Sequence, residues 1–200
     1  MREFIIVGRP NCGKTMLALS FAGYIGSKTI DITFRTFDGL LTCRHFSLAE
    51  AKRELCGMVI HKTRSLQTVV LKMSLGKTTI NFKLTDTCGL TPHIHHEEVI
   101  RRGMAQTLNM MRSADFVLHV IDAAVLPKEV NKENNIDFEI YSYGKIRHNY
   151  ALLANKIDLP AARDNLSRIA SLFPNVPIIP VSGLHGVGFK EVKACVARNI

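Results

Sequence analysis

Residues 4–15 read Phe4-Ile5-Ile6-Val7-Gly8-Arg9-Pro10-Asn11-Cys12-Gly13-Lys14-Thr15. The first four suit a short buried strand, and the next eight match the phosphate-binding pattern G-x-x-x-x-G-K-[ST]. In such a loop the glycines let backbone N–H groups turn inward around phosphate oxygens, the lysine adds a positive charge, and the last hydroxyl can coordinate Mg²⁺. The mostly apolar run from Thr15 to Tyr24 predicts a helix whose positive N-terminus faces the phosphates. We therefore expect the nucleotide to contact Arg9, Pro10, Asn11, Cys12, Gly13, Lys14, Thr15 and Met16.

A second motif, Asn155-Lys156-Ile157-Asp158, directly follows the apolar run from Tyr150 to Ala154. Because ligands collect at the carboxyl ends of strands in open α/β sheets, this tetrapeptide would border the same site. The Asp158 carboxylate can accept two parallel hydrogen bonds from guanine, an arrangement that adenine cannot donate. Asn155 and the stem of Lys156 would brace the loop and cover the base. The tetrapeptide alone would be a common surface turn, but together with the phosphate loop it predicts a guanine nucleotide.

With these two motifs the chain resembles the GTP-binding domains of the translation-factor-related class, nearest to the bacterial Era and Der type. The phosphate loop has this family's spelling, G-R-P-N-x-G-K-T. Asp86-Thr87-Cys88-Gly89 is similar to its D-x-x-G, which implies that Asp86 holds Mg²⁺ through water and that the Gly89 N–H meets the γ-phosphate. Val181-Ser182-Gly183-Leu184 stands where the family has S-A-[KL], which implies that Ser182, Gly183 and Leu184 touch the guanine.

The resemblance also implies a switch threonine that completes the Mg²⁺ site. Lys62-Thr63-Arg64 is similar to the family's threonine followed by arginine, and Thr63 lies just before an expected hairpin. Thr29, Thr33 and Thr36 compete with it, because this region is longer here than in the family. The implied metal ligands are Thr15, Thr63 and Asp86.

Leu90 stands where Ras-like enzymes carry the glutamine that orients the attacking water. Leucine can neither donate nor accept a hydrogen bond, so hydrolysis is either very slow or supported by other groups. The resemblance implies such a group, because relatives with an asparagine at the position of Asn11 use it to hold K⁺ beside the phosphates. The alternative is that Asn11 only turns the loop.

The resemblance thus implies a Mg²⁺-dependent GTPase in which Asn11, Lys14 and Gly89 are the catalytic groups. The alternative function is a scaffold occupied by GTP or GDP that hydrolyses little and acts through its switch I segment on a protein or RNA partner. His93, His95 and His96 lack a pattern that would complete a metal site, which favours a switch II loop in which His96 or Glu97 positions water.

Strand and helix patterns alternate along the chain in the order βαββαβαβα. This order predicts an α/β fold of the P-loop NTPase type, a three-layer Ras-like G domain. We expect a mostly parallel six-stranded sheet with helices on both faces and one antiparallel edge strand. That strand would come from a hairpin, Leu66–Leu75 and Thr78–Thr85, joined by Gly76-Lys77 in a type II′ turn. Further expected elements are strands over Asp115–Asp122 and Val176–Val181 and helices over about 95–111 and Val187–Arg198.

Two segments are longer than a minimal domain of this family requires. The first, residues 28–60, enlarges switch I. In it Ile30, Ile32 and Phe34 alternate with polar residues, residues 40–46 can pair back, and Ser47-Leu48-Ala49-Glu50 resembles a capping box. The second, residues 127–148, is expected to form a polar surface loop.

Length and composition fit one domain over residues 1–200, because 200 residues with 46% hydrophobic content suffice for a sizeable core. No apolar run approaches the ~18 residues that span a bilayer, and the first strand begins too early for a signal peptide. Five cysteines without metal-site spacing fit a reducing compartment, so we expect a cytoplasmic protein. Cys12 and Cys88 flank the phosphate site and are candidate redox reporters.

The formal net charge is +9, and residues 44–83 hold eight Lys and Arg against Glu50 and Glu54. This excess around switch I and the hairpin predicts attraction for RNA or the ribosome, and a solvated basic face is an equal alternative. The resemblance also implies that a homodimer through the switch region is open to this chain.

Overall fold

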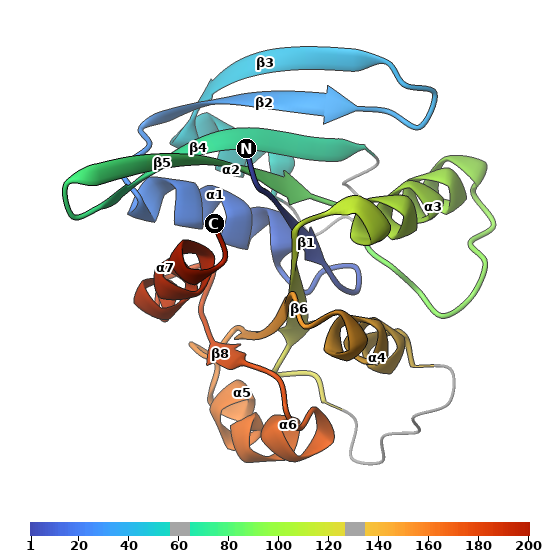
Figure 1. Ribbon diagram of the computed structural model, residues 1–200. Helices are drawn as coiled ribbons and strands as arrows, with labels where there is room; N and C mark the ends of the chain where they lie inside the picture. The colour runs from blue at the N-terminus through green and yellow to red at the C-terminus, as the bar shows by residue number, and fades with distance from the viewer. Residues whose placement is uncertain (57–64, 127–134) are drawn as a thin grey trace.

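The computed structural model describes residues 1–56, 65–126 and 135–200 (Figure 1). The elements follow one another as β1 (Glu3–Val7), α1 (Lys14–Tyr24), β2 (Thr29–Arg35), β3 (Leu41–Ser47), α2 (Leu48–Leu55), β4 (Leu66–Leu75), β5 (Thr78–Asp86), α3 (Glu98–Ser113), β6 (Phe116–Asp122), α4 (Ile136–Arg147), β7 (Tyr150–Asn155), α5 (Pro160–Asp164), α6 (Leu166–Leu172), β8 (Ile178–Pro180) and α7 (Phe189–Arg198). The strands and helices that the sequence predicts are present, with ends shifted by a few residues.

The strands of the described residues join one sheet in the order β3-β2-β4-β5-β1-β6-β7-β8. β1 pairs in parallel with β5 and β6, and β7 and β8 continue in the same direction. The pairs β4–β5, β2–β4 and β2–β3 are antiparallel. The expected α/β class is confirmed with two corrections. The described residues form eight strands rather than six, and the antiparallel strand β4 is internal, because β2 and β3 extend the sheet beyond it.

The two additional strands arise from the alternating pattern of residues 29–47. Ile30 pairs with Phe46 across β2 and β3, and both side chains are buried together with Ile32. α2 then begins with the expected capping box, in which the Ser47 hydroxyl accepts from the Glu50 N–H and the Glu50 carboxylate accepts from the Ser47 N–H. The described part of the enlarged switch I segment is therefore a hairpin and a helix.

Helices cover both faces of the sheet, with α1 and α7 on one side and α3 and α4 on the other (Figure 1). β1 contributes to both cores. Phe4 and Ile6 join the core under α1 and α7, whereas Ile5 and Val7 join the core under α3, α4 and α6. A strand buried on both faces is typical of the centre of a parallel sheet, so the loop that follows Val7 starts from a firmly packed position.

The polar loop expected over residues 127–148 is corrected in its second half, which forms α4; residues 127–134 lie outside the described part. Asn135 caps this helix, its Oδ1 accepting from the Asp137 N–H at 3.1 Å. Four apolar side chains are buried beneath the helix: Ile136, Phe138, Ile140 and Tyr141. The polar residues that precede Asn135 hide this short apolar pattern in the sequence.

The β4–β5 hairpin turns at Gly76, whose φ of 62° fits the first central position of a type II′ turn. Across the three described ranges, no helix combines the length and apolar character needed to cross a membrane.

Candidate nucleotide-binding site

The loop between β1 and α1 has a backbone that only glycine accommodates at two positions. Gly8 has a φ of 146° and Gly13 a φ of 96°. A Cβ atom at Gly8 would lie 2.1 Å from the Val120 carbonyl oxygen, and one at Gly13 would lie 2.3 Å from Asn155 Nδ2. Both glycines of the motif are therefore required by the backbone and by the neighbouring strands β6 and β7. Between them Asn11 is exposed and also left-handed, with a φ of 60°.

Lys14 begins α1 and is 6% exposed. Its Nζ donates to the carbonyl oxygens of Gly8 at 3.2 Å and Arg9 at 2.7 Å. The ammonium group is thus held by the phosphate loop itself through neutral acceptors. A phosphate oxygen is a stronger acceptor for such a cation, so this arrangement suits the exchange of carbonyls for phosphate. Met16, in the same first turn, is half-buried.

Asp86 ends β5 in register with Ile6 of β1, beside the phosphate loop. The Thr15 hydroxyl donates to Asp86 Oδ2 at 2.5 Å, while the buried Oδ1 has no hydrogen-bond partner among the described residues. Burial raises the pKa of Asp86 to about 6, and Lys14 and the Thr15 hydrogen bond oppose only part of this rise. A buried carboxylate oxygen without a partner beside a hydroxyl fits the oxygen ligands that a hard divalent cation prefers.

Asn155, at the end of β7, joins the phosphate loop to the loop after β8. Its Nδ2 donates to the Cys12 carbonyl at 2.8 Å, and its Oδ1 accepts from the Gly183 N–H at 2.9 Å. The Ser182 hydroxyl donates to Asp158 Oδ1 at 2.6 Å. The structure thereby brings together the two segments that the sequence expects to contact the base.

The remaining residues expected at the base lie in the same two loops. Lys156 has a φ of 70°, and its Nζ lies 2.5 Å from Asp122 Oδ2 at the end of β6. Gly183 packs on the first turns of α1, where a Cβ atom would lie 3.1 Å from Leu17 Cα. The Leu184 side chain is 59% exposed. Asp122 was missed by the sequence analysis, although its place at a strand end was visible.

Gly89 lies directly against the phosphate loop, since a Cβ atom there would lie 2.6 Å from the backbone nitrogen of Pro10. The Leu90 N–H donates to the Gly8 carbonyl at 3.1 Å. The Leu90 side chain is 1% exposed and belongs to the core that contains Val7. Its side chain is therefore committed to the protein interior.

The segment between Leu90 and α3 is largely exposed. His95 Nδ1 accepts from the Glu97 N–H at 3.1 Å, and Arg101 donates to the carbonyls of His95 and His96. Outside the two undescribed segments, no group of three or more His, Cys, Asp or Glu residues could hold a metal ion. The water-positioning role of His96 or Glu97 stays a prediction.

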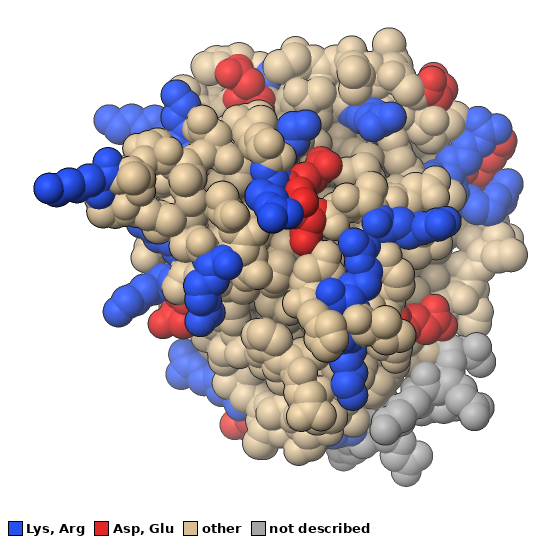
Figure 2. Space-filling view, in the orientation of Figure 1, with Lys and Arg blue, Asp and Glu red and all other residues tan. Residues whose placement is uncertain are grey.

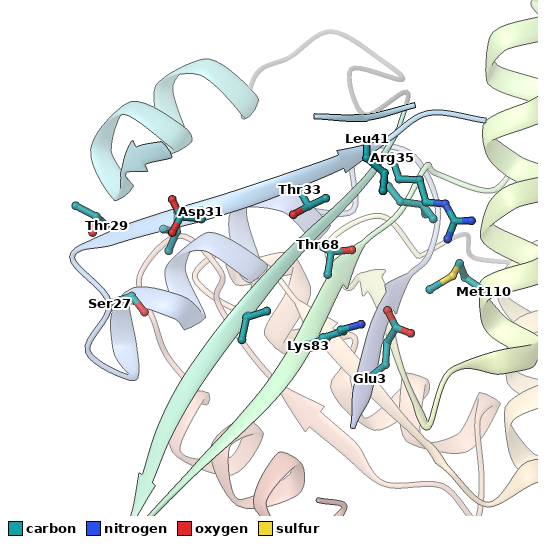
Figure 3. Close-up of a pocket in the computed structure, with 13 residues that line it drawn as sticks. Glu3, Ser27, Thr29, Asp31, Thr33, Arg35, Leu41, Thr68, Lys83 and Met110 are labelled. Atoms are coloured by element: carbon teal, nitrogen blue, oxygen red, sulfur yellow. The ribbon is translucent and has the colours of Figure 1, made fainter. Parts of the chain in front are cut away.

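Thr63 lies outside the described residues, and its three competitors have other surroundings. Thr29 and Thr33 line a pocket of about 540 Å³ on the face of β2, β4 and β5, shown in Figure 3. The strands β4 and β5 separate β2 from β1, and the pocket includes no phosphate-loop residue. The Thr36 hydroxyl bonds within the β2–β3 turn, to Asp38 and to the Leu40 carbonyl.

The two cysteines beside the phosphate site are shielded from solvent. Cys12 and Cys88 are each 1% exposed. Burial raises the pKa of both thiols, and the opposing charge of Lys14 does not cancel the effect. The expectation that they act as redox reporters loses its support, because a buried thiol with a raised pKa is a poor nucleophile.

The partners of Arg9 were also missed by the sequence analysis. Its Nε donates to Asp137 Oδ2 and its Nη2 to Asn135 Oδ1, each at 2.6 Å. Both partners begin α4, in the segment expected to be a loop. An N-cap asparagine followed by an acidic residue was the signal that could have marked this helix start.

Two curated GTPases are similar to this chain over different lengths. GTPase Der of Campylobacter jejuni is 23% identical over 192 residues, which are 96% of this chain and 33% of Der. GTPase Obg of Akkermansia muciniphila is 35% identical over 57 residues, 28% of this chain and 16% of Obg. The chain thus spans no more than about a third of the length of these two relatives.

Two solved structures show the same fold. Era of Aquifex aeolicus, a variant bound to GDP and AlF₄⁻, is similar with a TM-score of 0.68 and 20% identity, covering 100% of this chain and 57% of Era. The G domain of the T. maritima iron transporter FeoB has a TM-score of 0.57 and 18% identity, covering 100% of this chain and 98% of that domain.

A family model also matches most of the chain. Residues 3–156 match the sequence profile described as 50S ribosome-binding GTPase. This range begins with β1 and ends just after β7, so it includes the phosphate loop, Asp86 and Asn155. The chain belongs to the 50S ribosome-binding GTPase family.

Proposed function

We propose that this chain binds GTP with Mg²⁺ and hydrolyses it to GDP and phosphate, acting as a molecular switch. The observation that carries this proposal is the pair of hydrogen bonds made by Asn155, to Cys12 and to Gly183. Through them one side chain fixes the phosphate loop relative to the Asp158–Ser182 pair. Family membership and the nucleotide-bound Era structure support the same function.

The surroundings of Asp86 support Mg²⁺ as the cofactor. Thr15 and Asp86 would hold the ion, because their oxygens lie together and Asp86 Oδ1 is buried without a partner among the described residues. Thr63 is proposed as the switch ligand. When bound, the ion would neutralise charge on the phosphate oxygens.

The chain's own groups divide the remaining tasks. The Lys14 ammonium exchanges its bonds to the Gly8 and Arg9 carbonyls for phosphate oxygens, and the Gly89 N–H donates to the γ-phosphate. Asp158 accepts from guanine, and the Ser182 hydroxyl, which donates to Asp158 Oδ1, holds the carboxylate in place. The backbone of residues 9–16 and of Gly183 and Leu184 contacts the nucleotide at its two ends.

Leu90 leaves the positioning of the attacking water to other groups. Its side chain is buried in the core and has no polar atom to offer. We propose that K⁺ held beside the phosphates by Asn11 supplies positive charge where phosphoryl transfer accumulates negative charge. Asn11 is exposed in the phosphate loop, where its amide is open to solvent ions.

The buried Leu90 also favours the second candidate, a scaffold that binds GTP or GDP and hydrolyses little. A turnover assay separates the two candidates. Phosphate release from GTP is measured with Mg²⁺ at equal ionic strength in KCl and in NaCl, beside calorimetric binding of GTP, GDP and ATP. Tight GTP binding with no release in either salt would favour the scaffold, and equal binding of ATP and GTP would refute the guanine assignment.

The basic composition supports a polyanionic partner such as ribosomal RNA. Basic side chains predominate on the face shown in Figure 2 and lie spread over it, and Arg44 is paired with Glu54. A spread of this kind fits binding without base specificity. RNA binding that weakens steeply with salt and differs between the GTP and GDP states would support this partner. No binding at ~50 mM salt would mean that the basic residues only form a solvated surface.

A further inference from the structure

Arg9 belongs to the phosphate loop, but its guanidinium group points toward α4. Nε lies 2.6 Å from Asp137 Oδ2, and Nη2 lies 2.6 Å from Asn135 Oδ1. The same Asn135 oxygen accepts the Asp137 N–H that starts the helix. Arg9 therefore contacts the N-terminus of α4 in its folded form, at two groups that are 128 and 126 residues away in the chain.

Asp137 is in turn anchored from the sheet. Its Oδ1 lies 3.2 Å from His119 Nε2, and His119 Nδ1 lies 2.6 Å from the Tyr150 hydroxyl. The His119 side chain is fully buried, and in the β1–β6 register it stands opposite Val7, the last residue before the phosphate loop. The Asp137 side chain is only 15% exposed. Its position is thus fixed by two central strands rather than by α4 alone.

The charges within this network favour the ionised carboxylate. Burial raises the pKa of Asp137, but the hydrogen bond and charge of His119 and the charge of Arg9 outweigh it, so the pKa of Asp137 is lowered. Near neutral pH the Arg9–Asp137 contact is therefore a charge-assisted pair.

Among the described residues, Lys14 bonds to Gly8 and Arg9, Asn155 bonds to Cys12, and Arg9 bonds to α4, and each of these side chains holds part of the phosphate loop. In the proposed function Lys14 leaves the loop carbonyls for phosphate. After that exchange Asn155 still holds the loop at Cys12 and Arg9 still holds its outer part, residues 9–11, against α4.

We propose that Asp137 is a positioning residue for the nucleotide site, acting through Arg9 to hold the outer phosphate loop against α4. The proposal implies a more ordered loop and slower nucleotide release, and the second of these rests on the proposed GTP binding. The pair also keeps the Arg9 charge on the α4 side of the loop. Because α4 takes part through its first residues, a change at this helix start would alter nucleotide affinity from a distance.

Four variants test the proposal: Arg9→Ala, Arg9→Lys, Asp137→Asn and the double variant Arg9→Ala with Asp137→Asn. Arg2 and Asp115 provide a matched control, because they form an Arg–Asp pair at 2.8 Å at the start of β1, at the opposite end of that strand from the phosphate loop. The first readout is hydrogen exchange of the peptide that covers residues 8–13 in nucleotide-free protein. The second is the dissociation rate of a fluorescent GDP analogue.

We expect each single variant to speed exchange in the loop peptide, and to speed GDP release by about fivefold, the effect of one partly exposed charge-assisted bond. The double variant should add little, because the two residues act as one unit. Arg9→Lys should be less affected than Arg9→Ala in both readouts, because the lysine keeps a positive charge beside Asp137. The control Arg2→Ala with Asp115→Asn should leave both readouts unchanged.

Loop exchange in Arg9→Ala equal to that of the unmutated protein would overturn the proposal, as would additive effects in the double variant. Arg9→Ala keeps the test valid if Asp137→Asn folds poorly, because Arg9 is 43% exposed and fills no core position. Failure of the unmutated chain to bind GDP would refute the proposed function only, since the exchange measurement needs no nucleotide.

Discussion

The Thr15 hydroxyl and the Asp86 carboxyl group share a hydrogen bond of 2.5 Å across 71 positions of sequence, and the second oxygen of Asp86 is buried with no hydrogen-bond partner in the described structure. The contact joins the first turn of α1 to the end of β5. It satisfies only one of the two carboxyl oxygens, so an ionised Asp86 is an incompletely satisfied charged group in the protein interior. Such a group costs stability unless it is protonated or binds a cation.

The first prediction concerns the pH dependence of stability without nucleotide or Mg²⁺. Burial raises the pKa of Asp86 from 3.8 to about 6, so the folded state binds the proton more tightly than the unfolded state. This contribution stabilises the fold below pH 4 and is lost as the pH rises through about 6. Asp86→Asn should remove it, and urea denaturation at pH 8 should show the variant more stable by up to about 3 kcal/mol. An unchanged difference between the two proteins at pH 4 and pH 8 would contradict this.

The second prediction concerns base specificity. Asp158→Asn should lower GTP affinity by ~2 kcal/mol and shift preference toward xanthine nucleotides, because the amide replaces a charged acceptor by a donor. The Ser182 hydrogen bond to Oδ1 should survive, since the asparagine oxygen still accepts. Asp164→Asn, an exposed position in α5, is the control for calorimetry. Unchanged GTP affinity in Asp158→Asn would remove this residue from the site.

The third prediction concerns Lys14. Lys14→Ala should abolish measurable GTP binding, because the loop loses its only ammonium group. The loop would then bind the phosphate oxygens mainly through its backbone N–H groups, which water also solvates. The fold should persist, because the described partners of Nζ all belong to the phosphate loop: the Gly8 and Arg9 carbonyls and the Cys12 sulfur. Circular dichroism checks the fold and calorimetry the affinity. GTP affinity equal to that of the unmutated protein would refute the assignment of Lys14 as a phosphate-binding residue.

The fourth prediction concerns the thiols. Cys43 is exposed on β3, whereas Cys12, Cys88 and Cys195 are buried and burial raises the pKa of each of these three. Iodoacetamide should therefore modify Cys43 at least ~10 times faster than the buried thiols in native protein. Mass spectrometry of timed samples gives the rates, with protein unfolded in urea as the control for access. Rapid alkylation of Cys12 that GTP prevents would restore the redox hypothesis.

The sequence predicted the parts of this molecule in which local chemistry and spacing act together. The glycines of the phosphate loop, the strand of β1 and the capping box at Ser47 each have a short-range cause, and the structure contains all three elements. For Asn155 the sequence predicted only that this residue lies near the phosphate loop at one edge of the sheet, and not which atoms it bonds. These bonds follow from the packing of β7 beside β6 and β8.

The parts that the sequence did not predict depend on long-range packing. α4 is stabilised by burying Ile136 and Phe138 against the sheet, and the polar residues that precede Asn135 obscured this pattern in the sequence. The Arg9–Asp137 contact depends on that helix and on His119, whose pairing with Asp137 has no local signal in the sequence. The alternation of apolar and polar residues in 29–47 indicated the strands β2 and β3. It did not indicate that β2 pairs with β4, and this pairing is what adds both strands to the main sheet.

The last prediction concerns the cation at Asn11. With Leu90 buried, GTP turnover should be at least about tenfold faster in KCl than in NaCl at equal ionic strength, a gain of ~1.4 kcal/mol in barrier. The competing explanation is that Asn11 only turns the loop, since its φ of 60° is a conformation that favours glycine and asparagine. Asn11→Gly separates these explanations, because glycine keeps the backbone but has no amide to bind an ion.

If the amide holds K⁺, Asn11→Gly and Asn11→Ala should both lose the potassium response while GDP binding remains, since Lys14 and the backbone cradle are intact. Asn175→Ala is the matched control, because Asn175 is another exposed asparagine with a positive φ, 64°, in the turn before β8. Its substitution should leave the potassium response unchanged. A potassium response that survives in Asn11→Gly would make Asn11 a turn residue, and the water would then have to be positioned by the His96–Glu97 segment or by a partner protein.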